Sequence, residues 1–480
     1  MARINTNVAA LTAQRGLAKS QKTLNDTLQR LSTGLRINRG ADDPAGLIAS
    51  ESLRSELSGI NQAVDNSSRA SNVIATAEGS LQEVASLLLN IKGLIVQAAN
   101  TGALSPDEIK ANQLQVDSAV QSITRISNTT TFAGLHLING SLDYITSGVD
   151  STAIQAMHVQ QANFGTNANI PVQVNVVTSA RTAELEFRAS AITSTVTLEI
   201  AGNTGVETLT FVSGTPASAV AYAVNRITDA TGVSAALLNP ANGASGVVFQ
   251  SNAYGSRQFV SIQAQHGGST GSFVTTDVNG NAKQRANGVD AVATINGALT
   301  VGDGLNLKLN TSTLDVEMTL DGQFGAGQTS FAITGGGSLF QLGAQVTSNQ
   351  QVNIGIQSVA ASNLGDNDVG FLSDVVTGGA ASLVSGNTRQ ASQIIERAIN
   401  QVAILRGRLG AFEKNTLQTN INSLNVAMEN VTSSESTIRD ADFAEETSAL
   451  TRAQILTQAG TSVLSTANST PQSVLSLLQR

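Results

Sequence analysis

The sequence predicts a multidomain α+β protein, in which both termini form a long helical coiled-coil or rod core and a β-rich outer domain is inserted in the middle. Two observations predict this class. Apolar residues recur every seven positions from 1 to about 140 and from about 388 to 480, which is the spacing of helices packed along a seam. Between these ends, Gly, Thr and Val are frequent and apolar residues alternate, as they do in strands.

The N-terminal arm, residues 1–40, is a basic amphipathic helix. It contains seven Lys and Arg residues and a single acid, Asp26, so its net charge is +6. Because the total net charge is −8, the rest of the chain carries −14. Basic arms can bind nucleic acid or membranes, but these charges are spread along a helix without aromatic residues between them. We therefore predict no nucleic-acid binding and no membrane insertion. The apolar stripe of this arm comprises Ile4, Val8, Leu11, Leu24, Leu28, Leu31 and Leu35.

A second, much longer helix is predicted to begin at Pro44, with Asp43 as its N-cap. Its stripe extends over more than 40 residues, which corresponds to a rod on the order of 65 Å. Leu57 and Val64 are expected at the second seam position. The members of the first position are Leu53, Ile60, Ile74, Leu81, Leu88 and Ile95, with Ser67 interrupting.

A third helix is predicted after a turn near Gly102. Ser105, Pro106 and Glu108 have the spacing of a capping box with proline at the first helical position. A tight turn would make this helix antiparallel to the preceding rod. Its expected apolar face comprises Ile109, Val116, Ile123 and Ile126.

The C-terminal half repeats the pattern. One stripe contains Ile395, Val402 and Leu409, and it continues through Leu417, Ile421, Leu424, Met428 and Val431. The last stripe contains Leu450, Leu456 and Val463, and then Leu475 and Leu478 after an expected break at Pro471.

These terminal stripes are rich in small polar residues, and helices of this kind are marginal without packing partners. Because they extend beyond the span that the central rods need, a closed monomeric bundle is the less favoured interpretation. We predict that the apolar residues of both terminal stripes form an interface between copies of the chain.

The middle of the chain is predicted to form strands and turns. Residues 305–309 and 314–320 alternate and predict a hairpin, and residues 197–212 predict two strands joined at Gly202. A short helix capped by Thr215, with Pro216 at its first position, and a strand at 233–238 would complete a ββαβ unit. Further strands are expected within 163–177 and 344–356 and are assigned to the rod.

The chemistry that the sequence excludes is informative. None of the three His residues, His136, His158 and His266, has another His at ligand spacing, and no nucleophile elbow or phosphate-binding loop is present. We expect no enzymatic activity, no cofactor and no metal site. The chain opens without the apolar segment of a secretory signal, so export would use a route that reads another feature.

Both ends resemble bacterial flagellins. The motifs that show this resemblance are Arg3-Ile4-Asn5-Thr6-Asn7, Leu28 to Asn38, Arg452 to Leu464 and Pro471 to Leu478. The resemblance implies a structural subunit that polymerises into the extracellular flagellar filament used for swimming. It implies three domains: residues 1–40 with 440–480 as an inner-tube coiled coil, 41–180 with 335–439 as a helical rod with a small β region, and 181–334 as the surface-exposed variable domain.

The same resemblance implies partners and leaves alternatives. The partners are further copies of the chain, hook-associated and cap proteins, and an export chaperone, with passage through the flagellar export channel. The alternatives are a hook–filament junction protein with similar termini, and an adhesin displayed on the filament.

An immune-receptor-binding stretch of many flagellins resembles Leu-Gln-Arg-Val-Arg-Glu-Leu-Ala-Val-Gln. Here residues 88–97 keep Leu94, but Asn90 replaces an Arg and Gly93 replaces a Glu. The loss of a guanidinium fork and of a carboxylate removes charge-assisted hydrogen bonds. The resemblance therefore implies weak or absent recognition by that receptor.

Overall fold

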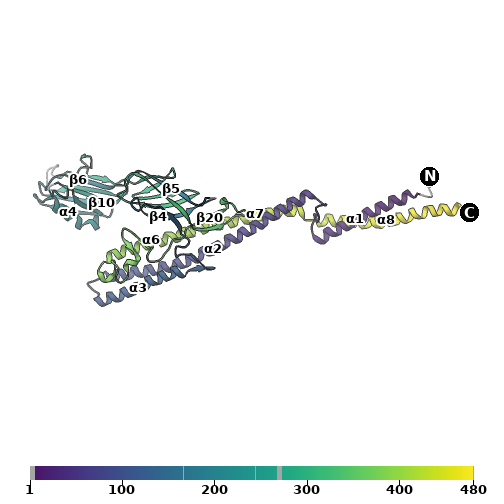
Figure 1. Cartoon of the computed structure of the whole chain (residues 1–480), viewed down its shortest axis with the longest axis horizontal. Coiled ribbons are helices and arrows are strands. Elements are labelled where there is room, and N and C mark those ends of the chain that lie inside the picture. Colours follow the sequence, from purple (N-terminus) through teal and green to yellow (C-terminus); the bar gives the residue numbers. More distant parts are fainter. Residues whose placement is uncertain (1–5, 166, 244, 267–272, 479–480) are drawn as a thin grey trace. The chain divides into compact units, whose positions relative to one another are not determined.

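The computed structural model describes residues 6–165, 167–243, 245–266 and 273–478 (Figure 1). Contacts divide the chain into two compact units. The first, the terminal unit, contains residues 1–70, 341–350 and 414–480. The second, the central unit, contains residues 71–340 and 351–413. The expected class is confirmed, because helices occupy both ends of the chain and strands occupy its middle.

The terminal unit is built from long helices. They are α1 (Val8–Thr33), the first part of α2 (Pro44–Ala98), α7 (Thr419–Arg439) and α8 (Phe443–Leu478). Helix α7 is antiparallel to α2, because Arg439 pairs with Glu51 at 2.7 Å and Asn420 donates to the Ser67 hydroxyl at 3.1 Å.

The ends of these helices follow local rules. Asn7 accepts a hydrogen bond from Ala10 N at 3.0 Å at the start of α1, and Gly34 ends that helix in the left-handed region, with φ of 75°. At the start of α2, Asp43 Oδ1 accepts from Gly46 N at 2.8 Å, with Pro44 as the first helical residue. The expected break at Pro471 is wrong, since α8 continues through this residue to Leu478.

The seam of α2 has a strict heptad spacing, but its second position differs from the expected one. Leu57 and Val64 are only partly buried. The second position is instead filled mainly by alanines, whose small side chains let neighbouring helices approach closely. The buried seam residues are Ile60, Ala63, Ser67, Ala70, Ile74, Ala77, Leu81, Val84, Leu88, Ile91, Ile95 and Ala98.

In the central unit, α6 (Thr388–Phe412) buries the expected Ile395, Val402 and Leu409. Helix α3 (Pro106–Thr129) buries the expected Val116 and Ile123, whereas Ile109 and Ile126 are only partly buried. Helix α6 leads into a π-helix, Glu413–Gln418, which the sequence analysis did not predict. The sequence does contain its signature. Leu409 and Leu417 are both buried but eight residues apart, so one residue more than a heptad separates them, and a π-turn accommodates that residue within a continuous helix.

Two β-sheets share one hydrophobic core in this unit. One has the strand order β14-β13-β5-β18-β3 and the other β15-β16-β17-β4. The predicted hairpin is confirmed, with β16 and β17 antiparallel and Asn310 opposite Asp315. The strands are β3 (Tyr144–Ser147), β4 (Ile154–Ala162), β5 (Ile170–Thr178), β13 (Val292–Ile295), β14 (Ala298–Leu299), β15 (Val301–Asp303), β16 (Asn306–Asn310), β17 (Leu314–Leu320) and β18 (Gly327–Gly336).

A second core, which we call the outer core, lies between the sheets β12-β11-β7-β8 and β6-β10-β9. Helix α4 (Ala217–Arg226) contributes Val220 and Val224 to this core. The strands are β6 (Thr182–Phe187), β7 (Val196–Ala201), β8 (Val206–Phe211), β9 (Val233–Leu237), β10 (Val247–Tyr254), β11 (Phe259–His266) and β12 (Arg285–Asn287).

The predicted ββαβ order of elements is found, but two of its details are not. Strand β9 pairs with β10 rather than with β7 or β8, so the last strand belongs to the other sheet. The N-cap of α4 is Pro216, without a side-chain hydrogen bond, and Thr215 instead donates to Val212 O at 2.7 Å. The threonine hydroxyl thus closes the preceding turn.

The remaining elements are short. They are β1 (Thr131–Phe132), β2 (Leu135–His136), α5 (Thr228–Thr231), β19 (Ser338–Gln341), β20 (Gln351–Ile354), β21 (Gly365–Asp366) and β22 (Gly370–Phe371), with 3-10 turns at Ser348–Gln350, Leu372–Val375 and Leu383–Ser385.

Candidate assembly surface

Helices α1 and α8 form an antiparallel pair whose seam consists mainly of small residues. In both helices the least exposed positions recur at alternating spacings of three and four, which is a heptad pattern. On α1 these positions are Ala10, Ala13, Leu17, Ser20, Leu24, Thr27 and Leu31. On α8 they are Glu446, Leu450, Ala453, Thr457, Gly460, Leu464 and Ala467.

Gly460 of α8 lies against Leu17 of α1. A Cβ atom at this position would lie 3.3 Å from Leu17 Cδ1 and 3.5 Å from Leu17 Cβ. The side chain of Leu17 would therefore have to shift slightly for a Cβ at 460, and further for a branched side chain.

Polar contacts fix the register of the pair. Asn7 Nδ2 donates to Ala467 O at 2.8 Å, and Arg30 pairs with Glu446 at 3.0 Å. The Glu446 side chain is only 10% exposed, so this ion pair is better shielded from solvent than a typical surface pair. Near the end of α1, Leu35 forms a strand-like bridge with Asp440. The two terminal segments are thereby tied together within one chain.

The predicted interface residues divide into two sets. Leu24, Leu31, Leu35 and Leu450 are partly covered. The other set remains exposed and consists of Val8, Leu11, Leu28, Leu456 and Val463, with exposed fractions between 46% and 62%. The structure thus leaves these five apolar side chains exposed in a single chain.

Three predicted interface residues lie outside this description. Ile4 falls outside the described residues, and the same is true of the side chains of Leu475 and Leu478. Conversely, Phe443 and Ile455 are exposed on α8, at 71% and 62%, and the sequence analysis missed them. Their spacing of twelve residues does not match the seven-residue stripe that guided the prediction.

The other predicted site residues lie on α2 or at the start of α3. Ser105 and Glu108 form a reciprocal capping box, in which the Ser105 hydroxyl accepts from Glu108 N and Ser105 N donates to Glu108 Oε2 at 2.7 Å. The hydrogen bonds that the carboxylate accepts from the Ser105 backbone and side chain lower the Glu108 pKa below its usual value. Asn90 and Gly93 are exposed on α2 and Leu94 is partly buried. Nearby, Lys92 pairs with Glu396 at 3.2 Å.

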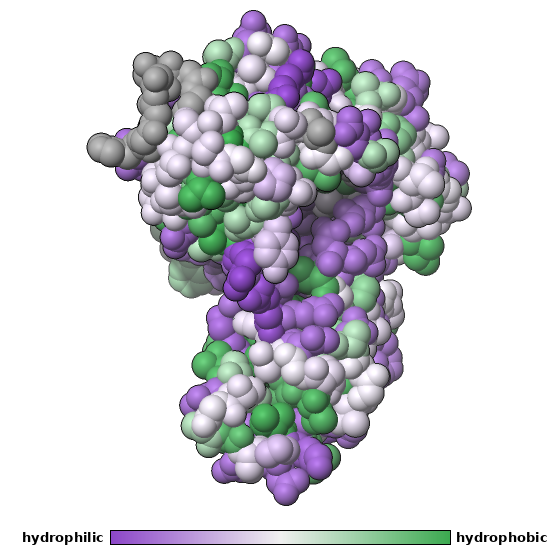
Figure 2. Space-filling view, turned by 90° about the vertical axis from the view of Figure 1, so that its left-hand side faces the viewer, coloured by the Kyte–Doolittle hydropathy of each residue, from purple (hydrophilic) through white to green (hydrophobic). Residues whose placement is uncertain are grey.

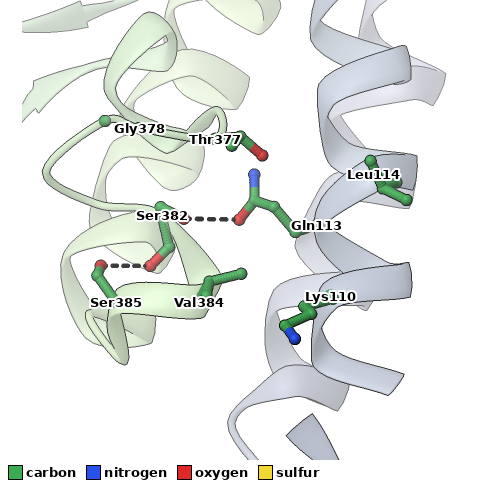
Figure 3. Close-up of a pocket in the computed structure, with 9 residues that line it drawn as sticks. Lys110, Gln113, Leu114, Thr377, Gly378, Ser382, Val384 and Ser385 are labelled. Atoms are coloured by element: carbon green, nitrogen blue, oxygen red, sulfur yellow. Dashed lines mark hydrogen bonds between the residues drawn. The ribbon is translucent and has the colours of Figure 1, made fainter. Parts of the chain in front are cut away.

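A pocket of about 570 Å³ lies between α3 and the loop of residues 377–385 (Figure 3). The buried Gln113 amide closes it, because its oxygen accepts from Ser382 Oγ at 3.1 Å and from Leu383 N at 2.7 Å. In Figure 3, Lys110 and Leu114 lie on the same helix as Gln113. The lining contains Ser and Thr hydroxyls, and the Thr377 hydroxyl donates to Asp117 Oδ2 at 2.6 Å beside the pocket.

Ionisable groups elsewhere have structural roles. The Tyr144 hydroxyl accepts from Ala162 N at 2.9 Å, and burial raises the Tyr144 pKa to about 12. Across the described ranges, no group of three or more His, Asp or Glu side chains could hold a metal ion. Within the same ranges, no helix has both the length and the apolar composition needed to cross a membrane. The surface in Figure 2 shows hydrophilic and hydrophobic residues interspersed.

The terminal helices pair through a seam of small residues, polar contacts fix their register, and several apolar side chains stay exposed. These features are typical of subunits that complete their packing by assembling with copies of themselves.

Comparison with known proteins identifies the family. The bacterial flagellin N-terminal helical region matches residues 4–143, and the bacterial flagellin C-terminal helical region matches residues 392–478. A flagellin of Salmonella rubislaw is 30% identical, and the B-type flagellin of Pseudomonas aeruginosa is 31% identical, each over 99% of both chains. The chain belongs to the bacterial flagellin family.

Among solved structures, FliC from Burkholderia pseudomallei is 16% identical to the chain. The match covers 73% of this chain and 99% of that one, with a TM-score of 0.23. Superpositions of this quality do not bear on the arrangement of the domains. Family membership does establish the role of the chain, which is that of a structural subunit of the extracellular bacterial flagellar filament.

Proposed function

We propose that the α1–α8 pair is the element through which the filament polymerises. Val8, Leu11 and Leu28 of α1 and Leu456 and Val463 of α8 would bury their side chains against other copies of the chain. The observation that supports this most directly is their exposure in the single chain. Because each is already about half covered, complete burial would gain roughly 1 kcal/mol per side chain, before the cost of ordering is subtracted.

The side chains that form the intramolecular seam would then have a different role from those that face outward. Leu24, Leu31, Leu35 and Leu450 would hold the two ends of one chain together. The outward residues would meet a different patch on the next copy, and such heterologous contacts do not close but build helical filaments. We place Ile4, Leu475 and Leu478 in the same assembly region by their positions in the sequence.

We propose the domain division that the family resemblance implies. Residues 1–40 with 440–480 would line the inner tube, 41–180 with 335–439 would form the rod, and 181–334 would project outward. The two β cores refine the last assignment, because the core that contains Ala291 and Phe331 also contains Val172 and Val174. The outer core, which takes residues from Ala183 to Ile262, is then the most distal segment.

We further propose that the chain has no enzymatic activity and that it works with hook-associated proteins, a cap protein and an export chaperone. Membership of a family of structural filament subunits supports the first statement. We also propose weak or absent recognition by the immune receptor that binds many flagellins. The support is that Asn90 and Gly93 are exposed on α2 and offer neither a guanidinium nor a carboxylate.

The polymerisation proposal is tested by seeded growth followed by electron microscopy. Monomers of the full chain should extend short filament seeds. A chain that lacks residues 1–35 and 445–480 should not, and the double variant Leu11→Ser/Leu456→Ser should extend them at least tenfold more slowly. Helix content measured by circular dichroism should be unchanged in the double variant, since both side chains are exposed in the monomer.

The matched control is Tyr222→Ser, which changes an exposed residue on α4. This variant should extend seeds as fast as the unmodified chain does. Filaments from the truncated chain, or unchanged growth of the double variant, would contradict the proposal. Growth that stops at a short ring would instead support a junction protein.

A further inference from the structure

Residues 276–289 and strand β6 enclose a pocket in the central unit. Glu186 and Thr276 exchange two backbone hydrogen bonds of 2.8 Å at one end of β6, and Arg181 and Val289 exchange two of 2.9 Å at the other. Between these two bridges, β6 and the segment separate. They enclose a pocket of about 640 Å³.

The lining of this pocket is polar and carries charges of both signs. It includes the cationic residues Arg181, Lys283 and Arg285, the acidic residues Glu184 and Asp277, and the amides of Asn279 and Asn287. Pockets of this size bind small molecules, and a few convergent polar groups set the orientation of the ligand.

Two of these charges cancel within the protein. Lys283 Nζ lies 3.0 Å from Asp277 Oδ2, and Asp277 also accepts hydrogen bonds from the backbone N–H groups of Asn281 and Asn279. Bonds from Asn281 and Lys283 are the main cause of the low Asp277 pKa of about 2. Asp277 therefore stays ionised and paired, and it holds the loop of Asn279 and Asn281 at the pocket edge.

The other charges have few internal partners. Among the described residues, the Arg181 guanidinium and the Glu184 carboxylate make no hydrogen bond or ion pair. The Arg285 guanidinium lies 3.9 Å from the centroid of the Phe259 ring, and its Nε donates to Asn287 Oδ1 at 3.5 Å, which leaves its other N–H donors free. Two guanidinium forks and one carboxylate thus face the pocket, with a net charge of +1.

We propose that this pocket binds a carboxylate-bearing saccharide, that is, the acidic sugar unit of a glycan. A guanidinium fork matches a carboxylate with two parallel hydrogen bonds, and a net charge of +1 balances one carboxylate. The Glu184 carboxylate would accept hydrogen bonds from sugar hydroxyls and would repel a phosphate dianion. The amides of Asn279 and Asn287 can donate to and accept from hydroxyls. This binding function is additional to filament formation and does not depend on it.

The test titrates the full-length monomer with N-acetylneuraminic acid and follows saturation-transfer-difference NMR. The methyl ester of the same sugar, which lacks only the charge, is the matched ligand control. We expect transfer to the acid and at least tenfold weaker binding of the ester. Arg181→Gln should weaken binding of the acid at least tenfold, since it removes one fork.

The protein control is Arg257→Gln. Arg257 is 78% exposed, pairs with Asp303 at 3.0 Å and does not line the pocket, so this variant should bind the acid within twofold of the unmodified chain. Both variants should keep the melting temperature, because Arg181 contributes to the β bridge through its backbone.

Four results would overturn the proposal. They are no transfer to the acid at millimolar concentration, equal binding of the ester, unchanged binding by Arg181→Gln, and preferential binding of inorganic phosphate or of a tetraglutamate peptide over the sugar.

Discussion

The terminal helical pair and the outer core differ in how far each completes its own packing. Among the described side chains of α1 only Thr27 is buried, and among those of α8 only Glu446 and Ala453 are. The outer core instead buries large residues such as Phe249, Leu185 and Ile200 completely or almost so. The comparison teaches that the outer core completes its packing within one chain, whereas the terminal pair leaves apolar side chains exposed, which in our proposal further copies cover.

The physical reason for this difference is the size of the seam residues. Burying apolar area contributes about 25 cal/mol per Å², and a seam of Ala, Ser, Thr and Gly offers little area per residue. The same small residues let α1 and α8 lie close together, with Leu17 against Gly460. A weak seam with a precise register suits a segment whose stability comes from assembly.

The largest expected effect is the loss of stability when Phe249 in the outer core is truncated. This side chain is fully buried, and its ring centroid lies 6.5 Å from that of Phe273. Phe249→Ala should lower the free energy of unfolding of the outer core by about 4 kcal/mol, measured by urea denaturation. Seeded filament growth should be unchanged. Tyr222→Ala, at a residue that is 69% exposed, should shift stability by no more than about 0.5 kcal/mol. Loss of growth in Phe249→Ala would show that the two regions are not independent.

A smaller loss of stability is expected where Gly460 of α8 lies against Leu17 of α1. Gly460→Val should push Leu17 away and weaken the α1–α8 pair by about 1–3 kcal/mol. Hydrogen exchange of the α1 and α8 amides in the monomer should therefore become about fivefold faster or more. Gly16→Val is the matched control, since no atom would lie within 4 Å of the added Cβ apart from its own helix. Equal exchange in the two variants would mean that the seam does not depend on this contact.

The smallest effect is a local pH dependence in the outer part of the chain. The folded pKa of Asp277, about 2, is below its unfolded value, so its contribution is fully present above pH 4 and is lost as the pH falls through about 2. Carboxyl ¹³C shifts should show Asp277 still ionised at pH 3, when exposed carboxyls are largely protonated. Lys283→Met removes one of the hydrogen-bond donors to Asp277 and should move this transition toward pH 4. An ordinary Asp277 titration near pH 4 in the unmodified chain would refute the loop geometry.

Much of the fold could be predicted because it depends on local signals. The strict spacing of Ile60, Ile74, Leu81 and Leu88 predicted the seam of α2, and the alternation of Leu307, Leu309 and Leu314 predicted the β16–β17 hairpin. These signals are periods of the chain itself. The Ser105 and Glu108 spacing similarly predicted a helix start that the structure contains.

Other features could not be predicted because they depend on which elements become neighbours. The pairing of β9 with β10 is a choice between two sheets, which alternation along β9 does not decide. The pocket beside β6 is also nonlocal, since it brings Arg181 next to Lys283 and Arg285, about a hundred residues away.

The sequence by itself determined that both ends are helical, where most helices begin, and that the middle forms strands, because heptads, caps and alternation act within a few residues of the chain. Only the tertiary structure decided which of the terminal apolar residues face inward. Leu24 and Leu31 turn toward α8, while Leu11 and Leu28 remain exposed. All four have the same side chain, so what separates them is the position of the neighbouring helix, which a period along one chain does not specify.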